Sequence, residues 1–342
     1  MTPHRQLTLV SRLALALCCV VVVLGAYVRL SAAGLGCPDW PGCYGHVSPI
    51  GAAANADASA ARYGGQAVEV AKAWKEMIHR YAAGTLGILI AVIAALAVQY
   101  RRHRLLSSAL ALGLLGLVVA QGLFGALTVT WRLKPLIVTG HLLFGLATLS
   151  LLWWIVLELA RTDQHISFAG DPARATLAPG WALAALLVVI GQISLGGWTS
   201  TNYAATACPD LPTCQGAWLP EADFGNAFVL WRGLGINYEG GVLAPAARVA
   251  IHVAHRMGAV LATLLLLWVG HLALRAPRHS ALRRAGIVVL AALALQLLIA
   301  VSMILRGFPL WLATLHNAGA ALLLLATVYL LHATHTDARR GR

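Results

Sequence analysis

Glu76 and four histidines of this sequence stand where ionisable side chains are rare, at the beginning of long apolar runs. Glu76 and His79 are three residues apart and so share a helix face, ahead of a stretch from Ala82 to Val98 that carries no charge. An ionisable pair inside a membrane helix is costly unless it has a partner, which favours a functional site. A helix end whose polar side chains simply reach back to the interface is the alternative interpretation.

The chain contains an internal repeat that places these histidines in pairs. The segment 24–43 matches the segment 195–214 without a gap, at an offset of 171 residues, and Gln121 matches Gln296 further on. The repeated histidines are His79 with His255 and His141 with His316. Because a lone histidine in an apolar helix is more often an ordinary core residue, the recurrence carries the functional interpretation.

All four histidines closely follow the start of a span that runs in the same direction. At ~1.5 Å rise per residue they share one depth, roughly 7–15 Å below one membrane surface. One imidazole from each of two facing helices is how a helix bundle holds haem iron. Zinc or copper would more usually recruit cysteine, carboxylate or a third histidine. We therefore predict two bis-histidine haem sites, His79/His141 and His255/His316.

The two halves differ beside the first histidine of each pair. Glu76 corresponds to His252, and Arg29 corresponds to Ser200. A carboxylate beside a haem can take a proton or stabilise a developing positive charge. The first half is thus predicted to be the reaction site and the second a fixed cofactor site. His252 is an alternative ligand to His255, although the shared His-Arg pair favours His255.

Other polar residues admit simpler interpretations. Arg80 and Arg256 each follow a predicted ligand, where they would bind haem propionates or reach out to the interface; Arg29 is a further candidate for such a contact. The remaining histidines are predicted to be solvated, in loops or near helix ends. They are His4, His46, His103, His165, His271, His279, His332 and His335.

Four of the six cysteines form two short pairs, Cys37-Cys43 and Cys208-Cys214, in the loops that open each repeat. Disulfides persist on the outer side of a membrane, and five intervening residues with prolines make a tight loop that a disulfide can bridge. A structural disulfide and a redox-active one both remain open, with the redox role favoured for the pair in the half that carries Glu76.

The composition predicts an all-α integral membrane protein. Of the 342 residues, 59% are hydrophobic and 11% are charged, and the apolar runs predict eight transmembrane helices. The predicted spans are about 11–30, 75–98, 105–130, 135–160, 178–200, 246–274, 284–305 and 309–333. Four spans per half predict two repeated four-helix bundles related by a pseudo-twofold along the membrane normal, comprising residues 1–165, a cytoplasmic linker 166–178, and residues 179–342.

The net charge of +13 reflects membrane topology and no nucleic-acid partner. With both termini in the cytoplasm, short cytoplasmic segments hold 14 of the 25 Lys and Arg residues, and the loops with the cysteine pairs are periplasmic. Those 14 are Arg5, Arg12, Arg101, Arg102, Arg104, Arg161, Arg174, Arg275, Arg278, Arg283, Arg284, Arg339, Arg340 and Arg342.

The combination of these features resembles the bacterial haem A synthase family over about residues 11–334. The resemblance rests on the segment 27–43, on Gln121-Gly122, and on the residues Glu76, His79, Arg80, His141, His255, Arg256 and His316. It implies an inner-membrane enzyme that oxidises the methyl group at carbon 8 of haem O to a formyl group, giving haem A for terminal oxidases.

The resemblance also assigns roles. It implies that His255 and His316 bind a haem b cofactor, that His79 and His141 receive the substrate, and that Glu76 is the essential carboxylate. The formyl oxygen is thought in the family to come from water. A second cysteine pair is absent from many members of the family, so Cys208-Cys214 is a departure. Expected partners are the lipid bilayer, haem O, a haem O synthase, cytochrome oxidase assembly factors and a periplasmic thiol-disulfide protein.

Two other classes are compatible with parts of the sequence. A di-haem b-type electron carrier linked to quinol would also hold two bis-histidine haems, but it should stack them across the bilayer. A transporter built from repeats would show helices broken at mid-span by Gly or Pro, and these spans carry no mid-span Pro.

Overall fold

Long apolar helices make up most of the chain. The computed structural model describes residues 2–163 and 177–340, which contain helices and no β-strand. Eight of these helices are long and apolar enough to cross a membrane, which confirms the eight predicted spans. They are α1 Pro3–Leu30, α4 Val70–Gln99, α5 Ser108–Thr130, α6 Pro135–Asp163, α7 Pro179–Thr201, α9 Pro245–Leu274, α10 Ala281–Leu305 and α11 Leu310–Arg340. The predicted linker 166–178 lies outside the described residues except for its last two.

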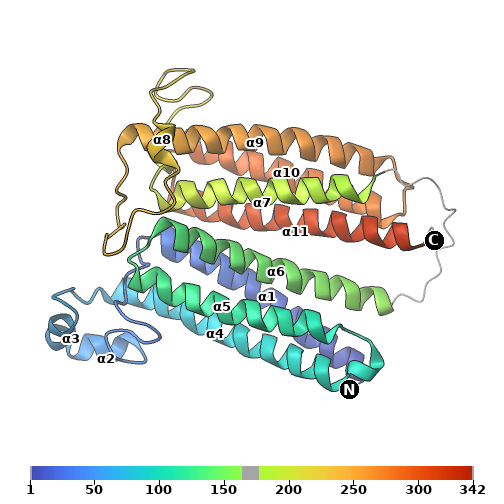
Figure 1. The fold of residues 1–342 in the computed structure, drawn as a ribbon, viewed down its shortest axis with the longest axis horizontal. Coiled ribbons are helices and arrows are strands. Elements are labelled where there is room, and N and C mark those ends of the chain that lie inside the picture. Colours follow the sequence, from blue (N-terminus) through green and yellow to red (C-terminus); the bar gives the residue numbers. More distant parts are fainter. Residues whose placement is uncertain (1, 164–176, 341–342) are drawn as a thin grey trace.

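Shorter helices occupy the connections. They are α2 Pro49–Ala54, α3 Ala56–Arg62, α8 Phe224–Ala227 and the 3-10 turns η1 Arg101–His103 and η2 Ala205–Ala207. The long helices lie side by side, with both chain ends at one end of the bundle (Figure 1). We call this the terminal end, and we call the opposite end, which carries residues 31–69 and 202–244, the loop end.

Several long helices begin with proline because a proline in the first turn loses no helical hydrogen bond and already has a helical φ. This holds for Pro3 of α1, Pro179 of α7 and Pro245 of α9. The observed α1 and α4 begin several residues before the predicted spans, since a helix continues through the polar interface beyond the apolar run.

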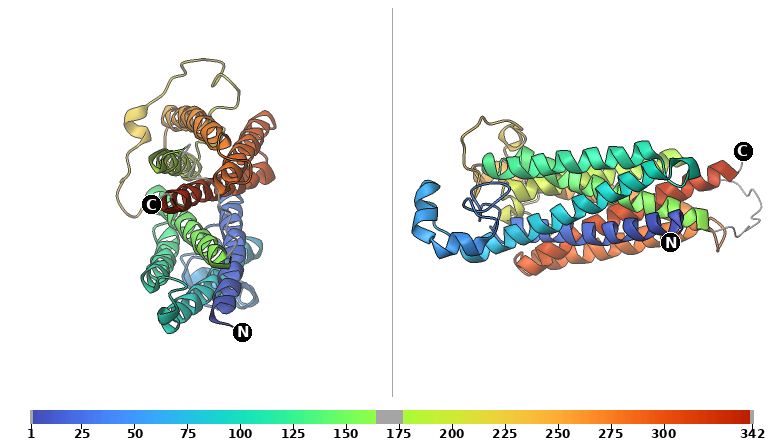
Figure 2. Two further views of the ribbon diagram at one scale, coloured as in Figure 1. Left: turned by 90° about the vertical axis from the view of Figure 1, so that its right-hand side faces the viewer. Right: turned by 90° about the horizontal axis from the view of Figure 1, so that it is seen from below.

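The long helices pack in two rings of four. In the first ring α1 packs on α4, α4 on α5, α5 on α6, and α6 back on α1. In the second ring α7, α9, α10 and α11 pack in the same cyclic order. Helices α4 and α6 therefore stand on opposite sides of one ring, and α9 and α11 on opposite sides of the other (Figure 2).

The two rings meet through α1 and α6 on one side and α7 and α11 on the other. Accordingly, 39% of the residues in the most apolar stretch of α6 are buried, and 44% of those in α11. The corresponding shares are 11% for α5 and 17% for α10. Exposed side chains on the outer helices, such as Leu123 and Leu298, are apolar. Lipid is as apolar as the protein core, so a membrane protein needs no polar outer face.

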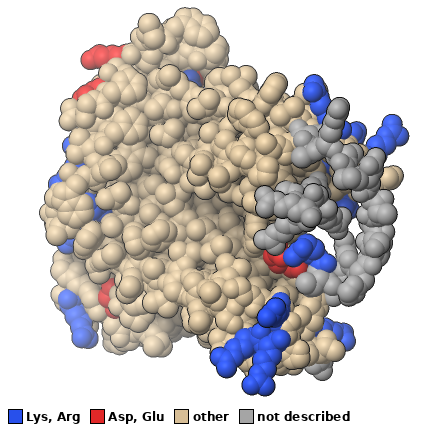
Figure 3. All heavy atoms as spheres, turned by 45° about the vertical axis from the view of Figure 1, so that its right-hand side comes forward, with Lys and Arg blue, Asp and Glu red and all other residues tan. Residues whose placement is uncertain are grey.

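Charged side chains concentrate at the ends of the bundle. Figure 3 shows Lys and Arg gathered at the terminal end, and the broad middle of that face carries no charge. The described basic residues at this end include Arg101, Arg102, Arg275, Arg278 and Arg284. An uncharged band between charged ends is the surface expected of a protein that spans a membrane.

At the loop end, the long connection of the second ring folds onto the α5–α6 turn of the first. The amine of Lys134, a residue only 1% exposed, donates to the carbonyl of Gly233 and lies 3.1 Å from the centroid of the Trp231 ring. Tyr238 donates its backbone N–H to the carbonyl of Arg132 over 3.1 Å. The two rings are thus joined outside the apolar core as well as within it.

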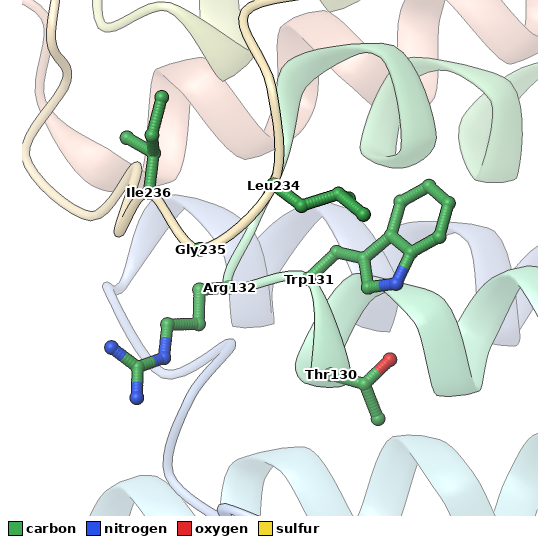
Figure 4. A pocket seen from close by; sticks show the side chains of 6 residues that line it. All are labelled: Thr130, Trp131, Arg132, Leu234, Gly235 and Ile236. Carbon is green, nitrogen blue, oxygen red and sulfur yellow. The ribbon is translucent and has the colours of Figure 1, made fainter.

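A cavity of about 320 Å³ lies at this junction, between Thr130–Arg132 and Leu234–Ile236 (Figure 4). The Leu234 side chain points towards the indole of Trp131, whereas the Arg132 side chain points away. None of the four repeated histidines lines this cavity.

We expect Lys134→Met to destabilise the protein by about 1–3 kcal/mol, because it leaves the Gly233 carbonyl without its donor and removes a cation over Trp231. Thermal unfolding of the purified protein in detergent measures the change. Lys72→Met is the matched control: Lys72 pairs with Glu69 in an exposed ion pair, which contributes about 0–1 kcal/mol. Equal melting temperatures for the two variants would contradict this role of Lys134.

Candidate functional site

The structure places the repeated histidines on the opposing helices of each ring. His79 lies on α4 and His141 on α6, each within the first third of its helix counted from the loop end. His255 on α9 and His316 on α11 have equivalent positions. His79 and His141 are close enough to interact electrostatically, as are His255 and His316. The two pairs predicted from the sequence are therefore brought together.

Glycines make room for the histidine rings on the neighbouring helices. A Cβ added to Gly25 would lie 2.9 Å from Cε1 of His79, and one added to Gly196 would lie 3.1 Å from Cε1 of His255. Gly125 has the same relation to His141, at 3.3 Å. Contacts this short exclude a side chain at Gly25 without a shift of the ring, so the glycines determine how closely the helices approach the imidazoles.

Glu76 is buried at the loop end of α4, with 4% of its surface exposed. The backbone N–H of Cys37 donates to Oε2 over 2.9 Å, and the Arg80 guanidinium donates to Oε1. Both carboxylate oxygens are thus hydrogen-bonded, which offsets the cost of burying the charge. Because Glu76 precedes His79 by three residues, the carboxylate and the imidazole share one helix face.

Arg80 connects Glu76 to the first cysteine loop. Its Nη1 donates to the carbonyls of Asp39 at 2.8 Å, Pro41 at 3.3 Å and Gly42 at 2.5 Å. This loop is closed by the disulfide Cys37–Cys43. The guanidinium therefore binds backbone carbonyls and a carboxylate at the same time, a combination that its planar array of donors permits.

Arg256 has the same relation to the second cysteine loop. It donates to the carbonyls of Thr213 at 2.8 Å, Cys208 at 3.1 Å and Asp210 at 2.7 Å. The disulfide Cys208–Cys214 closes this loop, so both predicted cysteine pairings are confirmed. The sequence suggested propionate or interfacial contacts for both arginines, and the structure shows loop carbonyls as their partners.

An aspartate shapes each cysteine loop from inside. Asp39 accepts from the N–H groups of Tyr44 and Gly45, and Asp210 accepts from those of Gln215 and Gly216. A hydrogen bond from the Thr213 hydroxyl, together with these N–H groups, lowers the pKa of Asp210 to about 2. Asp210 therefore stays ionised at neutral pH, and the stability it gives its loop is lost only as the pH falls towards about 2.

His252 occupies the position that Glu76 has in the first half. It is 5% exposed, its Nδ1 lies 3.1 Å from the carbonyl of Ala204, and its ring packs edge-on against Phe308. The carboxylate of one ring is therefore replaced in the other by an imidazole bonded to its own loop, while the arginine is present in both.

Arg29 lies at the junction of the two rings. Its Nη2 donates to the carbonyl of Ser200 over 2.8 Å, and its guanidinium stacks 4.4 Å from the centroid of the Tyr203 ring. The buried Nε of Arg29 has no hydrogen-bond partner among the described residues. Ser200 is also the residue to which Arg29 corresponds in the repeat.

A contact between His332 and Glu158 at the terminal end was not predicted from the sequence. His332 was expected to be solvated, but it is 6% exposed and its Nε2 lies 3.1 Å from a carboxylate oxygen of Glu158. The expectation was wrong because α6 and α11 pack together at the centre of the molecule. The ring of Trp154 covers His332 at a centroid distance of 5.0 Å.

Glutamines inside the spans also contact the predicted ligand histidines, which the sequence did not predict. Gln121 donates to the carbonyl of His141 over 2.9 Å, and Gln296 donates to the carbonyl of His316 over 3.2 Å. The repeat contained a signal for this pair, since Gln121 and Gln296 correspond. Gln192, the third such glutamine, has no glutamine at the matching position of the first half.

The fold and these buried groups define a multi-pass helical membrane protein with paired histidines within its rings. Residues 9–328 match the family described as COX15-CtaA, cytochrome oxidase assembly protein. The chain belongs to this family.

Individual relatives agree with this assignment. The heme A synthase of Shewanella oneidensis is 41% identical over 338 residues, which cover 98% of this chain and 99% of that protein. The heme A synthase of Allorhizobium ampelinum is 27% identical over 90% of this chain and 85% of its own length. That of Halalkalibacterium halodurans is 26% identical over 64% of this chain and 67% of its own length.

We expect Arg80→Lys to expose the first disulfide to reduction while leaving the second unchanged, and Arg256→Lys to do the reverse. A lysine cannot replace a guanidinium that donates to several acceptors, and a lost hydrogen bond to a charged group costs about 1.5–3 kcal/mol. That corresponds to an increase of about tenfold or more in the population of the opened loop. Timed reduction by a thiol, alkylation and peptide mass spectrometry measure both disulfides in one sample. Equal rates in all variants would contradict the anchoring role.

Proposed function

We propose that this chain is a haem A synthase, which oxidises the methyl group at carbon 8 of haem O to the formyl group of haem A. The observation that carries the proposal is the pair of histidines on opposing helices of each ring, together with the buried carboxylate of Glu76 beside the pair of the first ring. The near full-length similarity to the heme A synthase of Shewanella oneidensis supports it. The product would serve terminal oxidases.

We propose further that the halves 1–165 and 179–342 are repeated four-helix bundles related by a pseudo-twofold along the membrane normal. The packing order of α1, α4, α5 and α6 is repeated by α7, α9, α10 and α11, which supports this symmetry. Between the rings, the contact of α6 with α7 has its counterpart in the contact of α11 with α1. The hydrogen bond between Arg29 and its repeat counterpart Ser200 is expected close to such an axis.

The residues of each ring fit a haem. Opposing helices present two imidazoles, and glycines on the adjoining helices place no side chain against the ring edges of His79, His141 and His255. Within residues 2–163 and 177–340, buried polar atoms without a hydrogen-bond partner include Nδ1 of both His79 and His141. Such atoms are expected beside a bound group that has its own polar atoms or metal.

In the first half, His79 and His141 would hold substrate haem O. Glu76 lies one helical turn from His79 and would accept a proton released as the methyl group is oxidised, or stabilise positive charge that develops there. Arg80 keeps the carboxylate in place through the salt bridge. The first cysteine loop covers this carboxylate, because the N–H of Cys37 also binds it.

In the second half, His255 and His316 would hold a haem b cofactor, which supplies one-electron redox chemistry. His252 bonds to the Ala204 carbonyl and is assigned no ligand role. Some guanidinium N–H groups of Arg29, Arg80 and Arg256 already bind backbone carbonyls or Glu76. These arginines would bind haem propionates only through the N–H groups that remain. A redox role for Cys37–Cys43, in exchange with a periplasmic thiol-disulfide protein, belongs to the same proposal.

The protein would lie in the bacterial inner membrane with both termini in the cytoplasm and both cysteine loops in the periplasm. The excess of arginine at the terminal end supports this orientation, because short basic loops stay on the cytoplasmic side. A haem O synthase and cytochrome oxidase assembly factors are the expected partners within the membrane.

We expect Glu76→Gln to lower haem A formation by about 10²–10⁴-fold, the range for loss of a general acid–base group, while bound haem is retained. Pigments extracted from membranes of cells that also supply haem O are separated by chromatography. His252→Gln keeps a donor for the Ala204 carbonyl and serves as the matched control, with haem A formation retained. Bound haem b without any haem A from the unmodified chain would overturn the synthase function and favour an electron carrier.

The orientation predicts the behaviour of reporter fusions. Green fluorescent protein fused to the C-terminus should fluoresce, because it folds in the cytoplasm, whereas alkaline phosphatase inserted after Gly65 or Gly235 should be active, because it needs the periplasm. Whole-cell fluorescence and phosphatase activity measure both. Active phosphatase at the C-terminus would reverse the proposed topology.

A further inference from the structure

Two glutamines contact the histidine rings of the second half. The amide nitrogen of Gln192 on α7 lies 3.1 Å from Nδ1 of His255 and donates to the backbone carbonyl of the same residue over 3.0 Å. The amide nitrogen of Gln296 on α10 lies 3.2 Å from Nδ1 of His316 and 3.2 Å from its carbonyl. Each amide therefore contacts both the ring and the backbone of one histidine.

The histidine rings of the first half lack these contacts. Gln121 binds the carbonyl of His141 but not its ring, and Nδ1 of both His79 and His141 has no hydrogen-bond partner among the described residues. The backbone of Val21 lies near the His79 imidazole, and Val21 is the repeat counterpart of Gln192. The side chain at this position of the first half is apolar and offers the ring no amide.

A second position changes together with this one. A Cβ added to Gly258 would lie 2.3 Å from Oε1 of Gln192, so the amide fits only because residue 258 is glycine. The counterpart of Gly258 in the first half is Ala82. The second half therefore has both the amide and the space for it, whereas the first half has neither.

A hydrogen bond to the second nitrogen of a metal-bound imidazole fixes its orientation, and loss of such a partner typically changes metal affinity or activity by about 10–100-fold. An amide carries both a donor and an acceptor, so it can pair with an imidazole in either tautomer. A ring held only by packing rotates and dissociates more readily than a ring held by a hydrogen bond.

We propose that Gln192 and Gln296 are positioning residues that retain the haem of the second half, and that Val21 with Ala82 makes His79 the exchangeable ligand of the first. The inference rests on the proposed haem ligation. It assigns a permanent cofactor to one ring and a substrate that enters and leaves to the other, through residues that do not themselves touch iron.

The first experiment removes the amide from the second half of the full chain. Gln192→Met keeps the side-chain length without the amide, and Gly258→Ala displaces the amide while raising helix propensity. Both should speed the transfer of haem b from the detergent-solubilised protein to excess apomyoglobin by about tenfold or more. Gly191→Ala is the control, because a Cβ there meets nothing within 4 Å.

The same samples provide a spectroscopic test of positioning. The electron paramagnetic resonance g-values of ferric bis-histidine haem depend on the angle between the two imidazole planes. Gln192→Met and Gly258→Ala should shift the signal of the haem b that remains, whereas Gly191→Ala should not. Unchanged release rates and g-values in both variants would overturn the positioning role.

The second experiment introduces the amide and its space into the first half. Val21→Gln combined with Ala82→Gly should slow the release of haem O and haem A to apomyoglobin by about tenfold and lower turnover accordingly. Leu17→Gln, one turn away on α1, adds an amide away from His79 and controls for the polar substitution. Release at the rate of the unmodified chain would refute the role of Val21 and Ala82.

These outcomes are distinguishable from a failure of the synthase function. Release rates are measured for any bound haem, so a chain that binds haem without making haem A still tests the role of Gln192. Conversely, formation of haem A together with unaltered haem b release in Gln192→Met and Gly258→Ala would refute this inference alone.

Discussion

A polar side chain within the apolar interior of a membrane protein needs a partner from the protein or from a bound group, and the whole arrangement depends on this constraint. The cost of an unsatisfied polar group is several kcal/mol where no water is present. Glu76 meets the requirement with Arg80 and the N–H of Cys37. The histidines meet it in part with glutamines, and the Nδ1 atoms of His79 and His141 have no hydrogen-bond partner in the described part of the chain.

The two halves share one scaffold and differ in a small number of side chains. Both have a ring of four helices, a disulfide loop held by an arginine, and two histidines on opposing helices. They differ at a few positions next to the first histidine, where Glu76 corresponds to His252 and Val21 corresponds to Gln192. In the proposed function, the scaffold would determine where a group is bound, and these positions would determine whether it reacts or remains.

The cysteine loops act as covers for the loop end of each ring. A disulfide closes each loop, and an aspartate within the loop accepts hydrogen bonds from its backbone. The arginine that follows His79 or His255 donates to the carbonyls of the loop. In the first half the same arginine, Arg80, also binds Glu76, so this one side chain connects the cysteine loop to the carboxylate. A change in one would be transmitted to the other over a single side chain.

The sequence by itself determined the eight spans, because long apolar runs are what a membrane-crossing helix requires. It also determined the cysteine pairings and the equivalence of His79 with His255, because the internal repeat aligns these residues. It could not determine which helices are neighbours. In lipid both faces of a helix are apolar, so hydropathy does not identify the packed face. Only the tertiary structure therefore placed Gln192 against His255, turned Arg256 towards loop carbonyls, and buried His332 against Glu158, since each contact joins elements far apart in the chain.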